Sequence, residues 1–140
     1  MYLTFDEYQE TGGTLSATTF NNFEFEAEAL INYRTFNRLK NVESVPDEVK
    51  RLTRYLIDLA QKKADSLSLG NAGDTTTSNA GSYIKSQSND GVSITYGGMS
   101  STDLYKVCSA EANQAIDRYL AGVTDVLGRK LLYRGLYPGE

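Results

Sequence analysis

The chain has 140 residues, of which 40% are apolar and 23% charged, and its net charge is −4. This length predicts one domain with a modest core, and the negative charge argues against a general nucleic-acid binder that neutralises phosphates. Histidine is absent and cysteine occurs once, which excludes an intramolecular disulfide framework and a thiolate zinc cluster. No apolar run reaches 18 residues and the first residues do not resemble a signal peptide. We therefore expect a soluble protein, intracellular at synthesis, with no membrane partner.

The first third of the chain predicts two helices. Thr4 and Glu7 have the spacing of a capping box, so a short helix should run to about Glu10 and stop at Gly12-Gly13. A longer helix over about residues 17–36 has two apolar stripes when its residues are spaced at about 100°. The first stripe contains Phe20, Phe23, Ala27, Leu30 and Ile31. The second contains Phe25, Ala29, Tyr33 and Phe36.

The second stripe of this helix predicts burial on a second side, because one stripe is enough for a helix on a single core. The surface that covers it could be a chain arm, the first short helix or a neighbouring subunit. A central helix in a small bundle is the alternative interpretation.

A third helix is expected from Pro46, whose fixed φ angle suits a first helical turn, to about Ala64. Its basic side is either a solvated face or a contact with an acidic neighbour. The apolar stripe is Val49, Leu52, Leu56, Leu59 and Ala60, and the basic residues are Lys50, Arg51, Arg54 and Lys62.

Residues 66–98 predict an inserted loop and a β-hairpin. Residues 66–82 are rich in Ser, Thr, Asn and Gly, a composition that does not fold alone and is either functional or ordered by a partner. The Asp90-Gly91 pair between two alternating segments predicts a hairpin turn. Val92, Ile94 and Tyr96 would share one face of that hairpin.

A fourth helix is expected from a cap at Ser100 or Ser101 to about Ala121, with Cys108 as a small buried apolar side chain. Residues 122–140 alternate leucine and tyrosine with basic residues and glycine, which predicts an extended arm. The predicted fold class is mainly α: a small bundle of about four helices with an inserted long loop and β-hairpin and an extended C-terminal arm. The helical domain would cover residues 1–121 and the arm residues 122–140.

The sequence contains no recognisable catalytic set, so we expect neither enzymatic activity nor a cofactor nor a metal site. Glu24 and Glu28 share a helix face, as do Asp6 and Glu10, and such pairs can bind a metal or act as acid and base. Solvated faces are the ordinary explanation of such pairs. Residues 1–33 contain six acidic and no basic residues, whereas the remainder, with 14 basic and 12 acidic residues, carries +2. This asymmetry suits head-to-tail contacts between copies, with chance clustering as the alternative.

The order of several short segments resembles that of head–tail connector proteins of tailed phages, the head-completion adaptors of siphophages and their prophage relatives. The similarity covers most of the chain, and it depends on the order of the segments because no single one is specific. The segments are Tyr2 to Tyr8, Gly12-Gly13, Phe23 to Leu39, Val45 to Lys50, Ser88 to Ser93, Tyr119 to Gly122 and Leu131 to Gly135.

This resemblance implies a non-enzymatic virion protein made in the host bacterial cytoplasm. Its copies would form a ring, usually twelvefold in the family, beneath the portal protein. The ring would extend the channel through which genomic DNA passes without sequence-specific binding, and it would present a surface to a stopper or another tail-side connector.

The resemblance also implies roles for individual segments. The C-terminal segment would dock on the portal through Leu131, Leu132, Tyr133, Arg134, Leu136 and Tyr137. The loop and hairpin would line the channel or meet the next ring through Gly70, Asn71, Gly73, Asp90, Gly91, Val92, Ile94 and Tyr96. The second stripe, Phe25, Ala29, Tyr33 and Phe36, would lie between subunits.

Three other functions stay open at this point. The chain could be another phage connector component, a stopper or a tail terminator, although these are usually richer in strand. It could be a small regulatory module whose loop binds a ligand. It could also be an enzyme with a metal held by Glu24 and Glu28.

Overall fold

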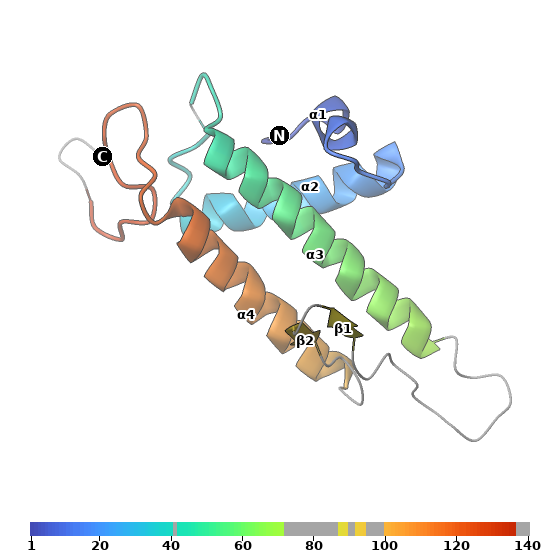
Figure 1. Cartoon of the computed structure of the whole chain (residues 1–140). Helices are drawn as coiled ribbons and strands as arrows, with labels where there is room; N and C mark the ends of the chain where they lie inside the picture. Colours follow the sequence, from blue (N-terminus) through green and yellow to red (C-terminus); the bar gives the residue numbers. More distant parts are fainter. Residues whose placement is uncertain (41, 72–86, 90–91, 95–99, 137–140) are drawn as a thin grey trace, which may run out of the picture. The chain divides into compact units, whose positions relative to one another are not determined.

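The computed structural model describes residues 1–40, 42–71, 87–89, 92–94 and 100–136, and the rest of the chain lies outside the described residues. Its helices are α1 (Phe5–Glu10), α2 (Ala17–Arg34), α3 (Asp47–Asn71) and α4 (Ser101–Leu120), drawn in Figure 1. The mainly α fold class with four helices is therefore confirmed for the described part of the chain. Residues 1–58 with 112–140 form one compact unit, and residues 59–111 form another.

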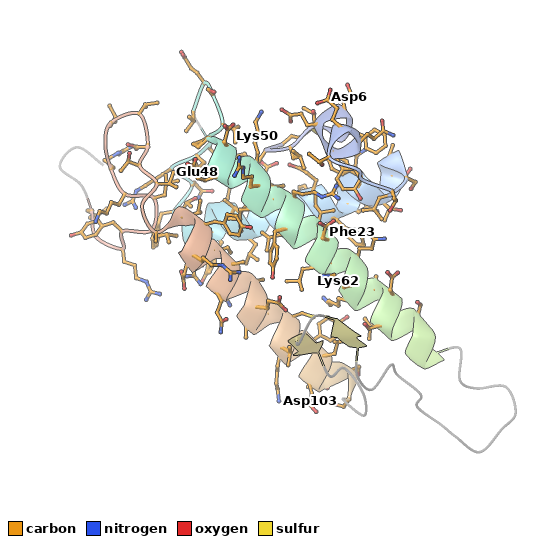
Figure 2. The ribbon with its side chains drawn as sticks, viewed as in Figure 1. Asp6, Phe23, Glu48, Lys50, Lys62 and Asp103 are labelled. Atoms are coloured by element: carbon orange, nitrogen blue, oxygen red, sulfur yellow. The ribbon has the colours of Figure 1, made fainter. Side chains whose placement is uncertain are left out.

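The capping box at the start of α1 is confirmed. Thr4 Oγ1 accepts a hydrogen bond from the Glu7 amide at 3.3 Å, and the Glu7 carboxylate accepts one from the Thr4 amide at 2.9 Å. Glu7 also forms an ion pair with Lys50 on α3, at 2.5 Å. Figure 2 labels Lys50 near the start of α3. The Lys50 ammonium and the Thr4 amide lower the pKa of Glu7 from 4.5 to about 2.

The core of the first unit begins where α1 packs against the first turn of α2. The Tyr8 and Phe20 rings lie 4.9 Å apart between centroids, and the Phe5 and Phe20 rings 5.4 Å apart. Leu3 and Ile57 complete this cluster, and Phe20 and Ile57 have no exposed surface. Tilted ring contacts of this kind add to the free energy of apolar burial.

Helix α2 begins at the N-cap Ser16, whose hydroxyl accepts from the Thr19 amide at 3.3 Å. Its first apolar stripe faces the core as predicted, since Phe20, Ala27 and Ile31 are buried. Helix α2 ends at Arg34, two residues before the expected end, because Phe36 and Asn37 adopt left-handed φ angles of +54° and +59° that a right-handed helix cannot continue.

Helix α3 is longer than the sequence predicted. It continues to Asn71, so the expected end at Ala64 and a loop beginning at residue 66 are wrong. The serines do not end the helix, because Ser66 donates to the Lys62 carbonyl and Ser68 to the Asp65 carbonyl, both at 2.8 Å. Serine is only mildly unfavourable within a helix, and the first strong stop signal is the later pair of glycines at positions 70 and 73.

In the second unit, Leu104 and Cys108 of α4 are buried together with Leu59 of α3. Burial raises the pKa of the Cys108 thiol, which keeps it protonated at neutral pH. Strands β1 (Gln87–Asn89) and β2 (Val92–Ile94) pair antiparallel, with Asn89 opposite Val92. The turn predicted at Asp90 and Gly91 lies outside the described residues.

The segment after α4 folds back onto the first unit, so the expectation of an extended arm is wrong for residues 123–131. Thr124 and Lys130 form an antiparallel bridge, and the Leu131 amide donates to the Val123 carbonyl at 3.1 Å. The tight turn between them is possible because Gly128 adopts a φ of +75°. Leu131 is completely buried at the end of this loop.

Candidate protein-interaction site

The second apolar stripe of α2 lies on the surface of the first unit. Phe25 is 72% exposed, Tyr33 78% and Phe36 50%, and Ala29 between them is also exposed. Monomeric proteins commonly expose single apolar residues, but aromatic side chains gathered along a helix face and the turn after it are typical of an interaction surface. We call Phe25, Ala29, Tyr33 and Phe36 the outer face of α2. Within the described structure no chain arm and no other helix buries these side chains.

Phe36 has an unusual backbone conformation. It follows the helix C-cap Thr35 with φ +54°, and Asn37 follows with φ +59°. The Asn37 amide donates to the Asn32 carbonyl at 2.9 Å, which is the long-range bond of a Schellman cap. The first residue after such a cap is usually glycine, because a side chain there costs on the order of 1–2 kcal/mol. The chain therefore carries a phenylalanine, half exposed, where the local backbone favours glycine.

Two hollows border the outer face. One, of about 420 Å³, is lined by Phe25, Ala29, Tyr33 and Lys40 among others. The second, of about 710 Å³, lies between the end of α2 and the C-terminal segment, and its lining includes Tyr33, Phe36, Leu132 and Arg134. Tyr33 and Asn37 line both, so the two hollows lie next to each other beside the exposed rings.

Arg38 holds the C-terminal segment beside this surface. Its Nη1 donates to the carbonyls of Lys130 and Leu131 at 3.2 Å and of Tyr133 at 2.6 Å, and its Nη2 donates to Gly135 at 3.0 Å. The same guanidinium lies 5.4 Å from the centre of the Phe36 ring. One side chain thus connects the strained turn to the segment predicted to dock on a portal.

The residues that were predicted to dock differ in their exposure to solvent. Leu131 is completely buried and is a core residue, so it is not available for docking in this structure. Leu132 is half-buried and lines the larger hollow. Tyr133 and Arg134 are exposed, and Leu136 is 85% exposed. Tyr137 lies outside the described residues.

Half of the eight residues predicted for the channel or the next ring lie outside the part of the chain that the structure describes. Gly73, Asp90, Gly91 and Tyr96 lie outside the described residues. Gly70 and Asn71 form the last turn of α3, which corrects their assignment to a loop, and Val92 and Ile94 belong to β2.

Glu24 and Glu28, considered above as metal ligands, are not joined by a third metal-ligating side chain among the described residues. Glu24 is buried and accepts a hydrogen bond from the Tyr2 amide at 2.7 Å. The Tyr2 hydroxyl bonds to Asn32, and burial raises its pKa to about 12. Among the described residues, no three acidic or cysteine side chains come together as a metal site would require.

Two structural features were missed by the sequence analysis. The first is Arg38, to which no role was assigned from the sequence. The second is Asp125, whose carboxylate accepts from the amides of Leu127 and Arg129, each at 2.9 Å, and from the Arg129 side chain at 2.6 Å. Burial alone would raise the pKa of Asp125, but these donors outweigh it and lower the pKa. An Asp followed by Gly three residues later is a turn signal that could have revealed this loop.

Within the described residues, no helix is both long and apolar enough to cross a membrane. Comparison of the chain with known protein families, with curated proteins and with solved structures gave no match.

Proposed function

We propose that this chain is a structural head–tail connector of a tailed phage, an adaptor whose copies form a ring beneath the portal. The ring would extend the DNA channel without sequence-specific binding and offer a surface to a stopper or other tail-side connector. The protein would act by assembly and catalyse no reaction. The order of sequence segments suggests the family, and the outer face of α2 is the observation that carries the proposal.

Assembly gives a physical reason for this outer face. Its three aromatic side chains would bury on the order of 400 Å² in a contact, worth on the order of 10 kcal/mol before the entropic cost of association. The backbone strain at Phe36 keeps one of these rings exposed although glycine would suit the isolated chain better. Strain of this kind is typically retained at functional positions, where binding recovers its cost.

The C-terminal segment supports the portal-facing part of the proposal. Leu132, Tyr133, Arg134 and Leu136 lie at or beside the larger hollow, held there by Arg38. We assign portal docking to these residues. The inserted loop and the hairpin containing β1 and β2 would face the channel or the next ring.

Native mass spectrometry of the protein, alone and mixed with the purified portal ring from the same genome, tests this function. A ring-sized multiple of the chain on the portal supports the adaptor. A strict monomer that ignores the portal refutes it and favours a small ligand-binding module, and binding to a tail tube rather than the portal favours a terminator.

Phe36→Gly separates assembly from folding. Glycine relieves the left-handed strain, so the free energy of unfolding should be unchanged or higher by up to about 1 kcal/mol. Loss of the ring should weaken assembly at least about tenfold, as expected for an aromatic hot spot. Leu127→Ser is the matched control, because Leu127 is as exposed as Phe25, at 72%, but lies outside the outer face. An assembly defect equal in both variants would contradict a specific role of the outer face.

Portal docking is best tested by Leu136→Ser rather than by deleting residues 129–140. Such a deletion would also remove the core residue Leu131 and the Arg129 partner of Asp125, so it would damage the fold. Leu136 is 85% exposed, and its replacement should reduce portal binding while leaving thermal unfolding unchanged.

A further inference from the structure

The first unit carries unpaired charges of opposite sign in two separate places. Asp6 and Glu10 on α1 are exposed and form no ion pair with any described residue, in contrast to Glu7 between them. Lys40 and Arg134 are exposed at the rims of the two hollows and likewise have no ion-pair partner in the described part of the chain. Figure 2 labels Asp6 on α1.

These two groups lie on different elements, and no ion pair joins them among the described residues. The acidic residues belong to α1, which packs on Phe20 in the first turn of α2, whereas the basic residues surround the turn that follows Arg34. Within the described residues, each group is left to pair with an opposite charge on another molecule.

A second copy of this chain carries both kinds of charge, the acidic residues on α1 and the basic residues beside the hollows. We propose that the outer face of α2 in one copy binds the acidic edge of α1 in the next, with Lys40 and Arg134 opposite Asp6 and Glu10. This rests on the proposed function and names the partner surface within the ring. The exposed rings Phe25, Tyr33 and Phe36 contribute most of the binding free energy, and the charges set the orientation and the rate of encounter.

The contact joins two different surfaces of the chain, so it is heterologous. Such a contact repeats from copy to copy and closes into a ring when the rotation between subunits permits. Because each copy keeps one free acidic edge and one free basic rim until closure, the charge pairing also prevents two copies from meeting rim to rim.

Two charge-reversed variants test this pairing. The first, Asp6→Asn with Glu10→Lys, changes the acidic edge, and its lysine lies at the C-terminal end of α1, where a cation is favourable. The second, Lys40→Glu with Arg134→Glu, changes the basic rim. All four side chains are exposed, so circular dichroism and thermal unfolding should match the unmodified protein.

Assembly is measured by native mass spectrometry and sedimentation, with and without the purified portal ring. Each variant alone should need at least a tenfold higher concentration to assemble. An equimolar mixture should recover assembly, with both variants in equal numbers, because each reversed end then meets an opposite charge. The unmodified protein should also assemble less well when salt rises from about 50 to about 500 mM, since screening weakens exposed charge pairs.

Glu43→Lys and Lys62→Glu are the controls, since both residues are exposed and form no ion pair among the described residues. Both controls should assemble normally. If the two charge-reversed variants assemble like the unmodified protein, or if the folded variants fail to rescue each other, the pairing is overturned while a ring on the portal still supports the connector function. If the unmodified protein assembles under no condition, both proposals fail.

Discussion

Replacing Arg38 by methionine should lower the free energy of unfolding by about 2–3 kcal/mol. Methionine keeps the apolar stem but removes a guanidinium that donates to four carbonyls of residues 130–135. Three of these four bonds come from Nη1, which has only two hydrogens. The four contacts therefore amount to about three full hydrogen bonds, two from Nη1 and one from Nη2. Two of the four are exposed, at Lys130 and Tyr133, and contribute less than the usual 1.5–3 kcal/mol of a charged donor.

Urea unfolding provides the assay. For a chain of this size the slope is about 1–3 kcal/mol per molar urea, so the loss should move the midpoint by roughly 0.7–3 M. The amide of Leu131, which donates to Val123, should also exchange faster with solvent. Arg51→Met is the control: Arg51 is exposed on α3, and its replacement should cost less than about 0.5 kcal/mol.

A double-mutant cycle with Leu131→Ala tests why Arg38 matters. Leu131→Ala alone should cost about 2–5 kcal/mol, because the side chain is completely buried. If Arg38 holds the backbone that seats Leu131, the double variant should cost at least about 1 kcal/mol less than the sum of the single variants. A loss below about 0.5 kcal/mol for Arg38→Met, or strict additivity in the cycle, would refute the idea that Arg38 fixes this segment.

Three further substitutions test local features of the first unit. The pKa of Glu7 is lowered to about 2 in the folded chain, so its ion pair with Lys50 and its cap stabilise the fold fully above about pH 4.5 and are lost as pH falls toward 2. Glu7→Gln should therefore lower the free energy of unfolding by about 1 kcal/mol at pH 7 and flatten the fall in melting temperature between pH 5 and 2. An unchanged pH profile would contradict this account. Asp125→Ala should cost about 2–3 kcal/mol, since it removes the acceptor of two amides and one guanidinium, and amide exchange in the turn should rise more than in Asp125→Asn, which keeps one acceptor oxygen. Gly13→Ala should cost about 1–3 kcal/mol in chemical unfolding, because its Cβ would lie 2.1 Å from the Tyr8 ring, and a neutral result would show that the ring moves aside freely.

Local signals in the sequence predicted the helices well, because each depends on residues only a few positions apart. The Thr4 and Glu7 spacing placed the start of α1, and Ser100 caps α4 through the Asp103 amide at 3.2 Å. The same reasoning failed at the end of α3, where composition suggested a loop although no glycine or proline stopped the helix before residue 70. A polar composition does not end a helix unless a residue disrupts the backbone.

The candidate site was predicted in part. Helical periodicity separated the two apolar stripes of α2, and the structure buries the first and exposes the second. The strained conformation of Phe36 could not be predicted, because nothing in the local sequence distinguishes it from another helical residue. The hollows could not be predicted from the sequence either, because they form between residues such as Phe36 and Leu132 that are far apart in the chain.

The sequence alone determined the mainly helical class, the helix starts and the two-sided character of α2, because these follow from residue spacing and capping chemistry. Only the tertiary structure decided which apolar residues became core and which remained on the surface. Leu131 and Leu136 belong to one alternating stretch, yet the first is completely buried and the second is 85% exposed. The difference arises because Arg38, more than 90 positions away, binds the carbonyls on either side and fixes where that segment meets the core. Partners this distant are selected by packing of the whole unit, which no local pattern encodes.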